Sequence, residues 1–318
     1  MPGLPALHLM PFLLFFFCVL LAPGAQNAGA EGLEGSMPTY LTSINYDEDD
    51  GKLTFPSFVT VDPVTDEIYI VDGKSRMIIY SPDFFPLYTL SRKNGIESPQ
   101  GIAIDDKGYI YIAMPTTKGE PKPRIAVFNP CLKWERDIFF SGFEGAKTFS
   151  PLRLAVADNG NLYVAGIPTE GLVILNNQGK FLDMMSPEEN DKKVLISDVT
   201  ITKDKKILLV SEESGRVFVY DEKGKFLFKF GEKGGSSGRL SRPKNVIMDK
   251  LGRMYVVDYM RHVVNIYEKD GKFIGEIGGM GWSEGWFQYP TSLAIDSKGR
   301  IFVSDMFNDR VQVFDTHE

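Results

Sequence analysis

The stretch Val246-Ile-Met-Asp249, followed after a short turn by Met254-Tyr-Val-Val-Asp258, is one of six copies of the same pattern in this chain. Each copy joins an apolar segment that ends near an acidic residue to a second apolar segment, across a turn that usually contains Gly. The first segments of the six copies end at positions 62, 105, 157, 202, 249 and 296, so neighbouring copies are 43 to 52 residues apart. Repeats of this length with several short strands are typical of β-propeller blades.

Each repeat contains four segments with the composition of β-strands. In the second repeat they are expected at Gly101–Asp105, Tyr109–Ala113, Arg124–Asn129 and around 134–140. Val, Ile, Tyr and Phe dominate these segments, and Gly, Asn, Asp or Pro occupy the joints, which is the pattern of strands and turns. Helical periodicity is missing nearly everywhere, and only Ser186–Val194 suggests a short helix. The sequence therefore predicts an all-β fold.

The two ends of the repeat array indicate how a ring could close. The last repeat stops after its third strand, at 310–314, whereas an extra strand-like segment at 40–45 precedes the first repeat. If the early segment forms the outer strand of the last blade, the exposed edges between the first and last blades disappear. We therefore expect a six-bladed β-propeller with four antiparallel strands per blade, closed by an N-terminal outer strand in the last blade.

The last two repeats resemble the NHL-repeat family. The resemblance rests on Ser241-Arg-Pro-Lys-Asn-Val-Ile-Met-Asp249 through Asp258 and on Phe287-Gln-Tyr-Pro-Thr-Ser-Leu-Ala-Ile-Asp296 through Asp315, and it extends more weakly over residues 40–315. It implies a six-bladed β-propeller in which the first strand of every blade lines a central channel. It does not imply one activity, because propellers carry binding sites and catalytic sites alike.

Residues 1–30 have the character of a secretory leader. Positions 9–22 are almost wholly apolar, and the small residues Ala28-Gly-Ala30 follow, as at a cleavage site. The apolar run is too short for a comfortable bilayer span. We therefore predict a signal peptide at 1–30 and a propeller at 31–318, secreted or periplasmic in the cell envelope, with no integral membrane span after leader removal. The alternative is an uncleaved leader that anchors the protein, since no Lys or Arg precedes the apolar run.

Charge and cysteine content narrow the possible partners and cross-links. With 35 Lys and Arg against 42 Asp and Glu, the net charge is -7, which disfavours nucleic acid as a partner because phosphate backbones are repelled. Cys18 lies in the leader, so Cys131 is the one cysteine that remains, and an intramolecular disulfide is impossible. The propeller must therefore be stabilised by packing.

A candidate ligand site follows from the resemblance and from strand alternation. The residues that begin the six channel-lining strands are expected to form a ring near one mouth of the channel: Phe58, Gly101, Arg153, Asp198, Asn245 and Ser292. The next inward positions are Thr60, Ala103, Ala155, Thr200, Ile247 and Ala294. Arg153 and Asp198 belong to adjacent blades and are expected to form an ion pair. As an alternative, Arg153, Asp198, Asn245 and Ser292 would bind a small polar ligand or a peptide terminus.

The densest aromatic segment lies just before the last repeat, at 281–289. Phe287 and Tyr289 are expected to pack at the joint between blades. Trp282 and Trp286 either pack there too or form a rigid, amphipathic contact surface for a protein or a glycan.

These features favour an exported, non-enzymatic scaffold that binds a protein or a cell-envelope component through its loops, without a cofactor. The main alternative is a metal-dependent hydrolase or lyase, lactonase-like, with its site at the channel mouth. The amidating lyases among NHL-like propellers imply a metal centre with several His ligands, but after the leader only His262 and His317 remain. A carboxylate and amide site through Asp198 and Asn245 would be the other route to a metal, although a full ligand set is not evident.

Overall fold

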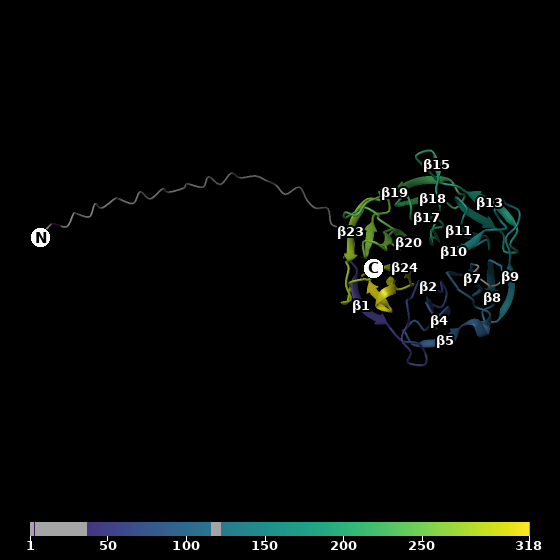
Figure 1. The fold of residues 1–318 in the computed structure, drawn as a ribbon, viewed down its shortest axis with the longest axis horizontal. Helices are drawn as coiled ribbons and strands as arrows, with labels where there is room; N and C mark the ends of the chain where they lie inside the picture. Colours follow the sequence, from purple (N-terminus) through teal and green to yellow (C-terminus); the bar gives the residue numbers. More distant parts are fainter. Residues whose placement is uncertain (1–2, 4–36, 116–121, 318) are drawn as a thin grey trace. The chain divides into compact units, whose positions relative to one another are not determined.

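The computed structural model of the protein describes residues 3, 37–115 and 122–317. Within the unit Gly35–Glu318, six four-stranded antiparallel sheets form a ring around a common axis, as Figure 1 shows. The predicted six-bladed β-propeller is confirmed. The predicted leader lies outside the described residues, apart from Gly3. None of the helices among the described residues has the length and apolar character needed to cross a membrane.

Each blade contributes four strands that follow one another from the channel outward. Blade one contains β2 (Phe58–Val61), β3 (Ile68–Asp72), β4 (Arg76–Tyr80) and β5 (Pro86–Leu90), and blade two contains β6 (Gly101–Ile104), β7 (Ile110–Met114), β8 (Arg124–Phe128) and β9 (Trp134–Ile138). Blade three contains β10 (Ser150–Val156), β11 (Leu162–Ile167), β12 (Leu172–Leu175) and β13 (Phe181–Met185), and blade four contains β16 (Asp198–Ile201), β17 (Ile207–Ser211), β18 (Arg216–Tyr220) and β19 (Phe226–Phe230). Blade five contains β20 (Pro243–Met248), β21 (Met254–Asp258), β22 (Val263–Tyr267) and β23 (Phe273–Gly278), and blade six contains β24 (Pro290–Ile295), β25 (Arg300–Asp305), β26 (Arg310–Asp315) and β1 (Thr39–Ile44).

The ring closes in the sixth blade, where the strand order is β1-β26-β25-β24. The N-terminal strand β1 runs antiparallel to β26, with Thr39 opposite Asp315 and Ile44 opposite Val311. The side chain of Ile44 is buried in the apolar cluster that blade six shares with blade one. The predicted closure by an N-terminal outer strand is therefore confirmed.

Six apolar clusters hold the ring together, one at each interface between neighbouring blades. Successive side chains of a strand point to opposite faces of its sheet, so each blade contributes one face to each of two clusters. The second strands lie between both clusters, and every residue of β3, β7, β17 and β21 is buried. This explains why the second segments of the sequence pattern are continuous apolar runs.

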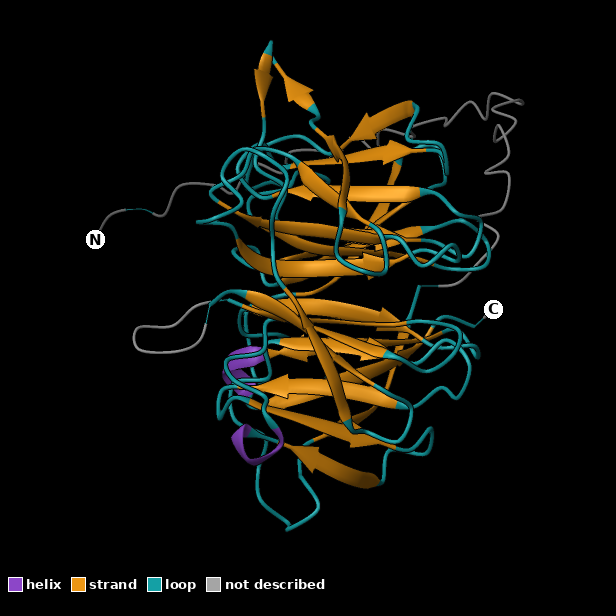
Figure 2. Ribbon diagram, turned by 90° about the vertical axis from the view of Figure 1, so that its right-hand side faces the viewer, coloured by secondary structure: helices purple, strands orange, loops and turns teal. Residues whose placement is uncertain are grey.

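The loops lie on two opposite faces of the ring. We call the loop face the one that carries the connections between blades, such as 279–289, and the loops between second and third strands, such as 306–309. The opposite turn face carries the turns from first to second and from third to fourth strands, such as 296–299. In Figure 2 the two short 3-10 helices, η1 (Arg92–Asn94) and η2 (Met306–Asn308), lie together on one side, which is the loop face.

The helix predicted at Ser186–Val194 is wrong. The segment forms a hairpin of β14 (Glu188–Glu189) and β15 (Lys192–Lys193). The two residues between these strands, Asn190 and Asp191, have φ values of 52° and 60°. A two-residue hairpin turn requires this left-handed conformation, which Asn and Asp adopt more readily than other non-glycine residues, and the local sequence is thus compatible with a turn rather than a helix.

Candidate functional site

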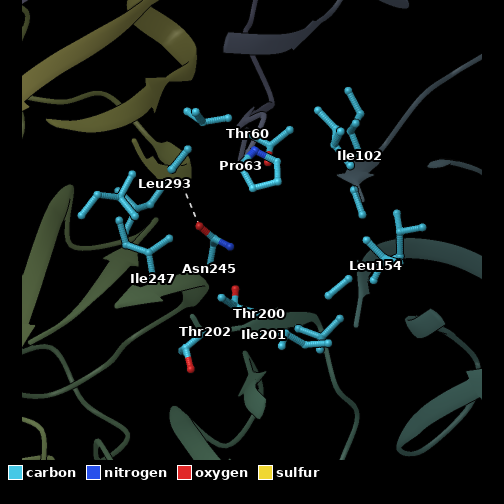
Figure 3. Close-up of a pocket in the computed structure, with 18 of the residues that line it drawn as sticks. Thr60, Pro63, Ile102, Leu154, Thr200, Ile201, Thr202, Asn245, Ile247 and Leu293 are labelled. Atoms are coloured by element: carbon cyan, nitrogen blue, oxygen red, sulfur yellow. Dashed lines mark hydrogen bonds between the residues drawn. The ribbon is translucent and has the colours of Figure 1, made fainter. Parts of the chain in front are cut away.

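The first strands of the six blades enclose a central cavity of about 350 Å³ (Figure 3). All six positions predicted to point inward line it: Thr60, Ala103, Ala155, Thr200, Ile247 and Ala294. Branched apolar side chains from the same strands, among them Leu154, Ile201 and Leu293, complete the wall. The channel is therefore mostly apolar along its length.

At the loop-face end of the cavity, two buried polar side chains face each other across the interface of blades four and five. Asp198 is 2% exposed and Asn245 is 4% exposed. Asn245 Nδ2 donates a hydrogen bond of 2.7 Å to Asp198 Oδ2, and Asn245 Oδ1 accepts one of 2.7 Å from the backbone N–H of Leu293. Asn245 thus links blades four, five and six.

The environment of Asp198 shifts its protonation equilibrium. Burial raises the pKa of Asp198 to about 6, because removal from water disfavours the charged carboxylate. The positive charge of Arg153 and the hydrogen bond from Asn245 act in the opposite direction and only partly offset burial. A carboxyl group with this pKa exchanges its proton near neutral pH.

Arg153 does not form the ion pair with Asp198 that the sequence suggested. Among the described residues no ion pair joins them; instead, Arg153 Nη1 donates a 2.5 Å hydrogen bond to the carbonyl oxygen of Gln100, and the guanidinium lies over the ring of Phe58 at 4.9 Å from its centroid. The side chain is satisfied by a carbonyl in blade two and a ring in blade one, so the carboxylate in blade four acts on it only through its field.

Gly101 makes room for this arrangement. A Cβ atom at this position would lie 2.8 Å from the carbonyl oxygen of Leu152 and 3.0 Å from Cα of Arg153. Real Cβ atoms essentially never approach backbone atoms this closely, so only Gly fits here. The glycine at this position of the channel mouth is therefore required by the close approach of the blade-three backbone at Leu152 and Arg153.

Ser292 joins the last blade to the first. Its hydroxyl Oγ lies 3.3 Å from both the backbone nitrogen and the carbonyl oxygen of Val59. Asp198 and Asn245 belong to the lining of the cavity, whereas Arg153 and Ser292 do not. The structure places all four predicted ligand-binding residues at the loop-face mouth, but it engages each of them in contacts between blades.

The opposite end of the cavity opens on the turn face and has a charged rim. Asp106, Asp158 and Lys203 are exposed there and belong to the cavity lining. Asp158 also forms an ion pair of 3.1 Å with Lys205. The two ends of the channel thus differ: buried hydrogen bonds between blades at one end, solvated charges at the other.

The two tryptophans of the loop face are exposed rather than packed. Trp282 is 76% exposed and Trp286 is 49% exposed, next to Met280 at 66%. These three side chains border a shallow hollow together with Ser283 and Gln288. Phe287, by contrast, is fully buried, as expected for a residue at the blade joint.

A row of aromatic rings extends across the loop face near the tryptophans. Tyr259 contacts Tyr289 at a centroid distance of 4.9 Å, Tyr289 contacts Phe307 at 5.0 Å, and Phe307 contacts Phe55 at 5.4 Å. Phe307 and Phe55 are 47% and 41% exposed. The sequence does not reveal this row, because its members come from three blades and Tyr259, Phe307 and Phe55 are far from Tyr289 in the chain.

Within the part of the chain that the structure describes, no group of three or more His, Cys, Asp or Glu could hold a metal ion. His262 is buried, and its Nδ1 accepts a 3.0 Å hydrogen bond from the backbone N–H of Tyr289. Burial also lowers the pKa of His262, and the hydrogen bond from Tyr289 occupies its Nδ1 atom within the fold.

These features define a six-bladed β-propeller with an apolar channel and an exposed aromatic surface on its loop face. Residues 235–318 match a family model, DUF5128, described as a 6-bladed beta-propeller. The fold is similar to that of a structural genomics protein of unknown function from Bacteroides thetaiotaomicron, with a TM-score of 0.61, 11% identity, and coverage of 88% of this chain and 72% of that one.

A protein of unknown function from Bacteroides caccae is also similar, with a TM-score of 0.53, 13% identity, and coverage of 70% of this chain and 80% of that one. No curated protein matches the chain. At these identities the likeness concerns the fold alone.

Proposed function

We propose that the protein is an exported, non-enzymatic propeller of the NHL type that binds a protein or a cell-envelope component through its loop face. The observation that carries the proposal is the exposure of Trp282 and Trp286 beside Met280. Trp is enriched at the centres of protein interfaces because a large, flat side chain buries much area with few torsions to order.

The base of this surface is held rigidly, which favours binding. The ring of Trp286 covers Gly279, where a Cβ atom would lie 2.6 Å from Cζ3 of the indole. The carbonyl oxygen of Trp286 accepts hydrogen bonds from Arg310 Nη2 at 3.0 Å and from Gln312 Nε2 at 2.7 Å. Little conformational entropy is therefore lost when a partner contacts the indole.

The tryptophan segment is also tied to the aromatic row. Asn308 Nδ2 donates a 2.9 Å hydrogen bond to the carbonyl oxygen of Gly281, so the loop that carries Phe307 lies against the segment that carries Trp282. Asp305, which is fully buried, accepts hydrogen bonds from Asn308 and Arg310 and anchors both loops. A partner could thus contact the tryptophans and the exposed face of Phe307 together.

Capture experiments with three proteins test this proposal: the wild type, a Trp282→Ala, Trp286→Ala double variant, and Trp134→Ala. Trp134 is a matched control, because it is 55% exposed but lies on β9, the outer strand of blade two. From an envelope extract of the source organism, we expect the wild type and Trp134→Ala to retain the same components and the double variant to lose them. Equal capture by all three would rule out the tryptophan surface.

Export is tested separately. The apolar segment at 9–22 and Ala28-Gly-Ala30 support a leader of residues 1–30. Fractionation of cells that express the full chain should place the protein outside the cytoplasm, with a mass that corresponds to cleavage after Ala30. An intact chain in the membrane fraction would instead support the uncleaved anchor, and a cytoplasmic protein would exclude both.

A further inference from the structure

We propose that the central channel is a second binding site, for a small uncharged alcohol with an apolar body, which enters from the turn face with its hydroxyl group leading. This site is independent of the loop-face function proposed above. It differs from the small-polar-ligand site suggested by the sequence. There the ligand would bind to Arg153, Asp198, Asn245 and Ser292 at the mouth of the channel, whereas here its body lies inside the channel, along the first strands.

The size and the wall of the cavity indicate the body of the ligand. A volume of about 350 Å³ lies within the range of small-molecule pockets, which is roughly 300 to 1,000 Å³. The wall consists largely of aliphatic side chains from all six blades, among them Leu154, Ile201, Ile247 and Leu293 (Figure 3). Such a wall gains free energy from burying an aromatic or alkyl group, at about 25 cal/mol for each Å² removed from water.

The hydrogen-bonding groups of Asn245 indicate which polar head group the ligand carries. Its side chain is 4% exposed, and Figure 3 shows the amide nitrogen directed into the cavity while the oxygen faces Leu293. An amide nitrogen has two N–H donors, of which Asp198 Oδ2 receives one at 2.7 Å. The second N–H can be accepted by a hydroxyl oxygen, which in turn can donate to the carboxylate of Asp198. A hydroxyl group is the simplest head that both donates and accepts.

The charges around the cavity explain why the ligand is uncharged. Asp198 and Arg153 have opposite charges near the same mouth, and each acts on the protonation of the other. Although the two groups form no ion pair, the field of Arg153 opposes that of Asp198, so a charged head would lose its hydration in the apolar channel with little net charge to compensate it. An uncharged alcohol group loses much less hydration free energy when it leaves water.

The direction of entry follows from the two ends of the channel. At the loop face, Arg153 spans the mouth from blade three to Phe58 in blade one, and Asp198 and Asn245 are hydrogen bonded to each other. At the turn face, the exposed Asp106 and Lys203 form an open rim. A ligand that enters there reaches Asn245 at the far end.

The probe that tests the proposal is β-naphthol, a fluorescent alcohol with two fused rings. We expect saturable binding to the purified protein, with perturbation of the methyl NMR signals of Ala103, Ala155 and Ala294. Naphthalene, which lacks the hydroxyl, should bind at least roughly tenfold more weakly, because the hydrogen bonds to Asn245 and Asp198 are both lost. 2-Naphthoate, which is charged at neutral pH, should bind more weakly still.

Two variants place the probe in the channel. Ala155→Phe and Ala103→Leu come from different blades and narrow the cavity, so either one that retains the wild-type circular dichroism spectrum should weaken β-naphthol binding at least tenfold. The Trp282→Ala, Trp286→Ala double variant should bind the probe as the wild type does, which separates this site from the loop face.

Three results would overturn the proposal. They are an absence of saturable β-naphthol binding by the wild type, shifts confined to methyl groups outside the channel, and equal affinities for β-naphthol and naphthalene. The methyl shifts and the ligand series use the wild-type protein, so the test holds even if both variants fail to fold.

Discussion

Arg153 of blade three lies over the ring of Phe58 of blade one, with 4.9 Å between its guanidinium carbon and the ring centroid. On its way it passes Gly101 of blade two and donates a hydrogen bond to the carbonyl oxygen of the neighbouring Gln100. One side chain therefore joins three blades at the loop-face mouth. The consequence is that this mouth is fixed by contacts other than the apolar clusters between neighbouring sheets.

Replacement of Arg153 by Met should destabilise the propeller by about 1–3 kcal/mol, because the hydrogen bond to Gln100 and the cation–π contact are both lost. Urea unfolding followed by circular dichroism measures the change. Arg92→Met is the control: the Arg92 side chain is 77% exposed, and its replacement should change stability by less than about 0.5 kcal/mol. Equal effects of the two substitutions would contradict the role of Arg153.

Gly101→Ala should also cost about 1–3 kcal/mol, because the added Cβ would lie 2.8 Å from the carbonyl oxygen of Leu152 and the backbone must move. Gly235→Ala is the matched control, since no atom lies within 4 Å of a Cβ built at that glycine. Thermal unfolding of both variants measures the difference. If Gly101→Ala and the control have the same melting temperature, a Cβ atom at position 101 fits at the channel mouth and the predicted clash with Leu152 is wrong.

Asp198 should make the stability of the wild type depend on pH. Its folded-state pKa of about 6 lies above the ordinary value of 3.8, so its contribution is most favourable below about pH 3.8 and is lost as pH rises through about 6. The Asp198→Asn variant has no carboxyl group at this position, so its stability lacks this pH-dependent contribution. The stability of the variant relative to the wild type should therefore increase between pH 4 and pH 7, by about 3 kcal/mol at most.

Urea unfolding at the two pH values gives this difference directly. Asn also keeps the size of the side chain and a hydrogen-bonding oxygen for Asn245. If the difference between variant and wild type is the same at pH 4 and pH 7, the carboxyl group of Asp198 titrates normally and burial does not control it.

Closure by β1 predicts a large loss of stability for one residue of the strand and a small loss for another. Ile44 is 4% exposed and lies in the cluster between blades six and one, whereas Leu41 is 47% exposed. Ile44→Ala should destabilise the ring by about 2–5 kcal/mol, and Leu41→Ala by less than about 0.5 kcal/mol. Chemical unfolding of both variants tests this; a similar small loss for both would mean that β1 contributes little to closure.

The fold could be predicted from sequence because its signals are local and repeat. The apolar segments ending at Asp105, Asp249 and Asp296 each combine strand composition with a turn signal, and their spacing reveals the blades without any knowledge of long-range contacts. The closing strand could be predicted as well, since one strand was missing at the end and one was spare at the beginning. The inward positions of the channel were expected from the resemblance to the NHL family together with strand alternation, and all six line the cavity.

The contacts of the mouth could not be predicted in this way. The ring position of Arg153 follows from the repeat, but its partner depends on the reach of a long side chain past a glycine, and this is invisible in the spacing. The exposure of Trp282 depends on which side of the connection 279–289 faces the joint between blades five and six. The hairpin around Asn190 depends on backbone conformation that a helical interpretation of its composition overlooks.

The pairing of β1 with β26 affects the order in which the protein can be completed. Residues 39–44 are synthesised before every other strand of the ring, yet their partner, 310–315, is synthesised after all of them. Until then the growing chain has an unpaired strand at its start and an uncovered apolar face on its first sheet. A chain that lacks β26 cannot cover that face, so closure of the ring requires synthesis through residue 315.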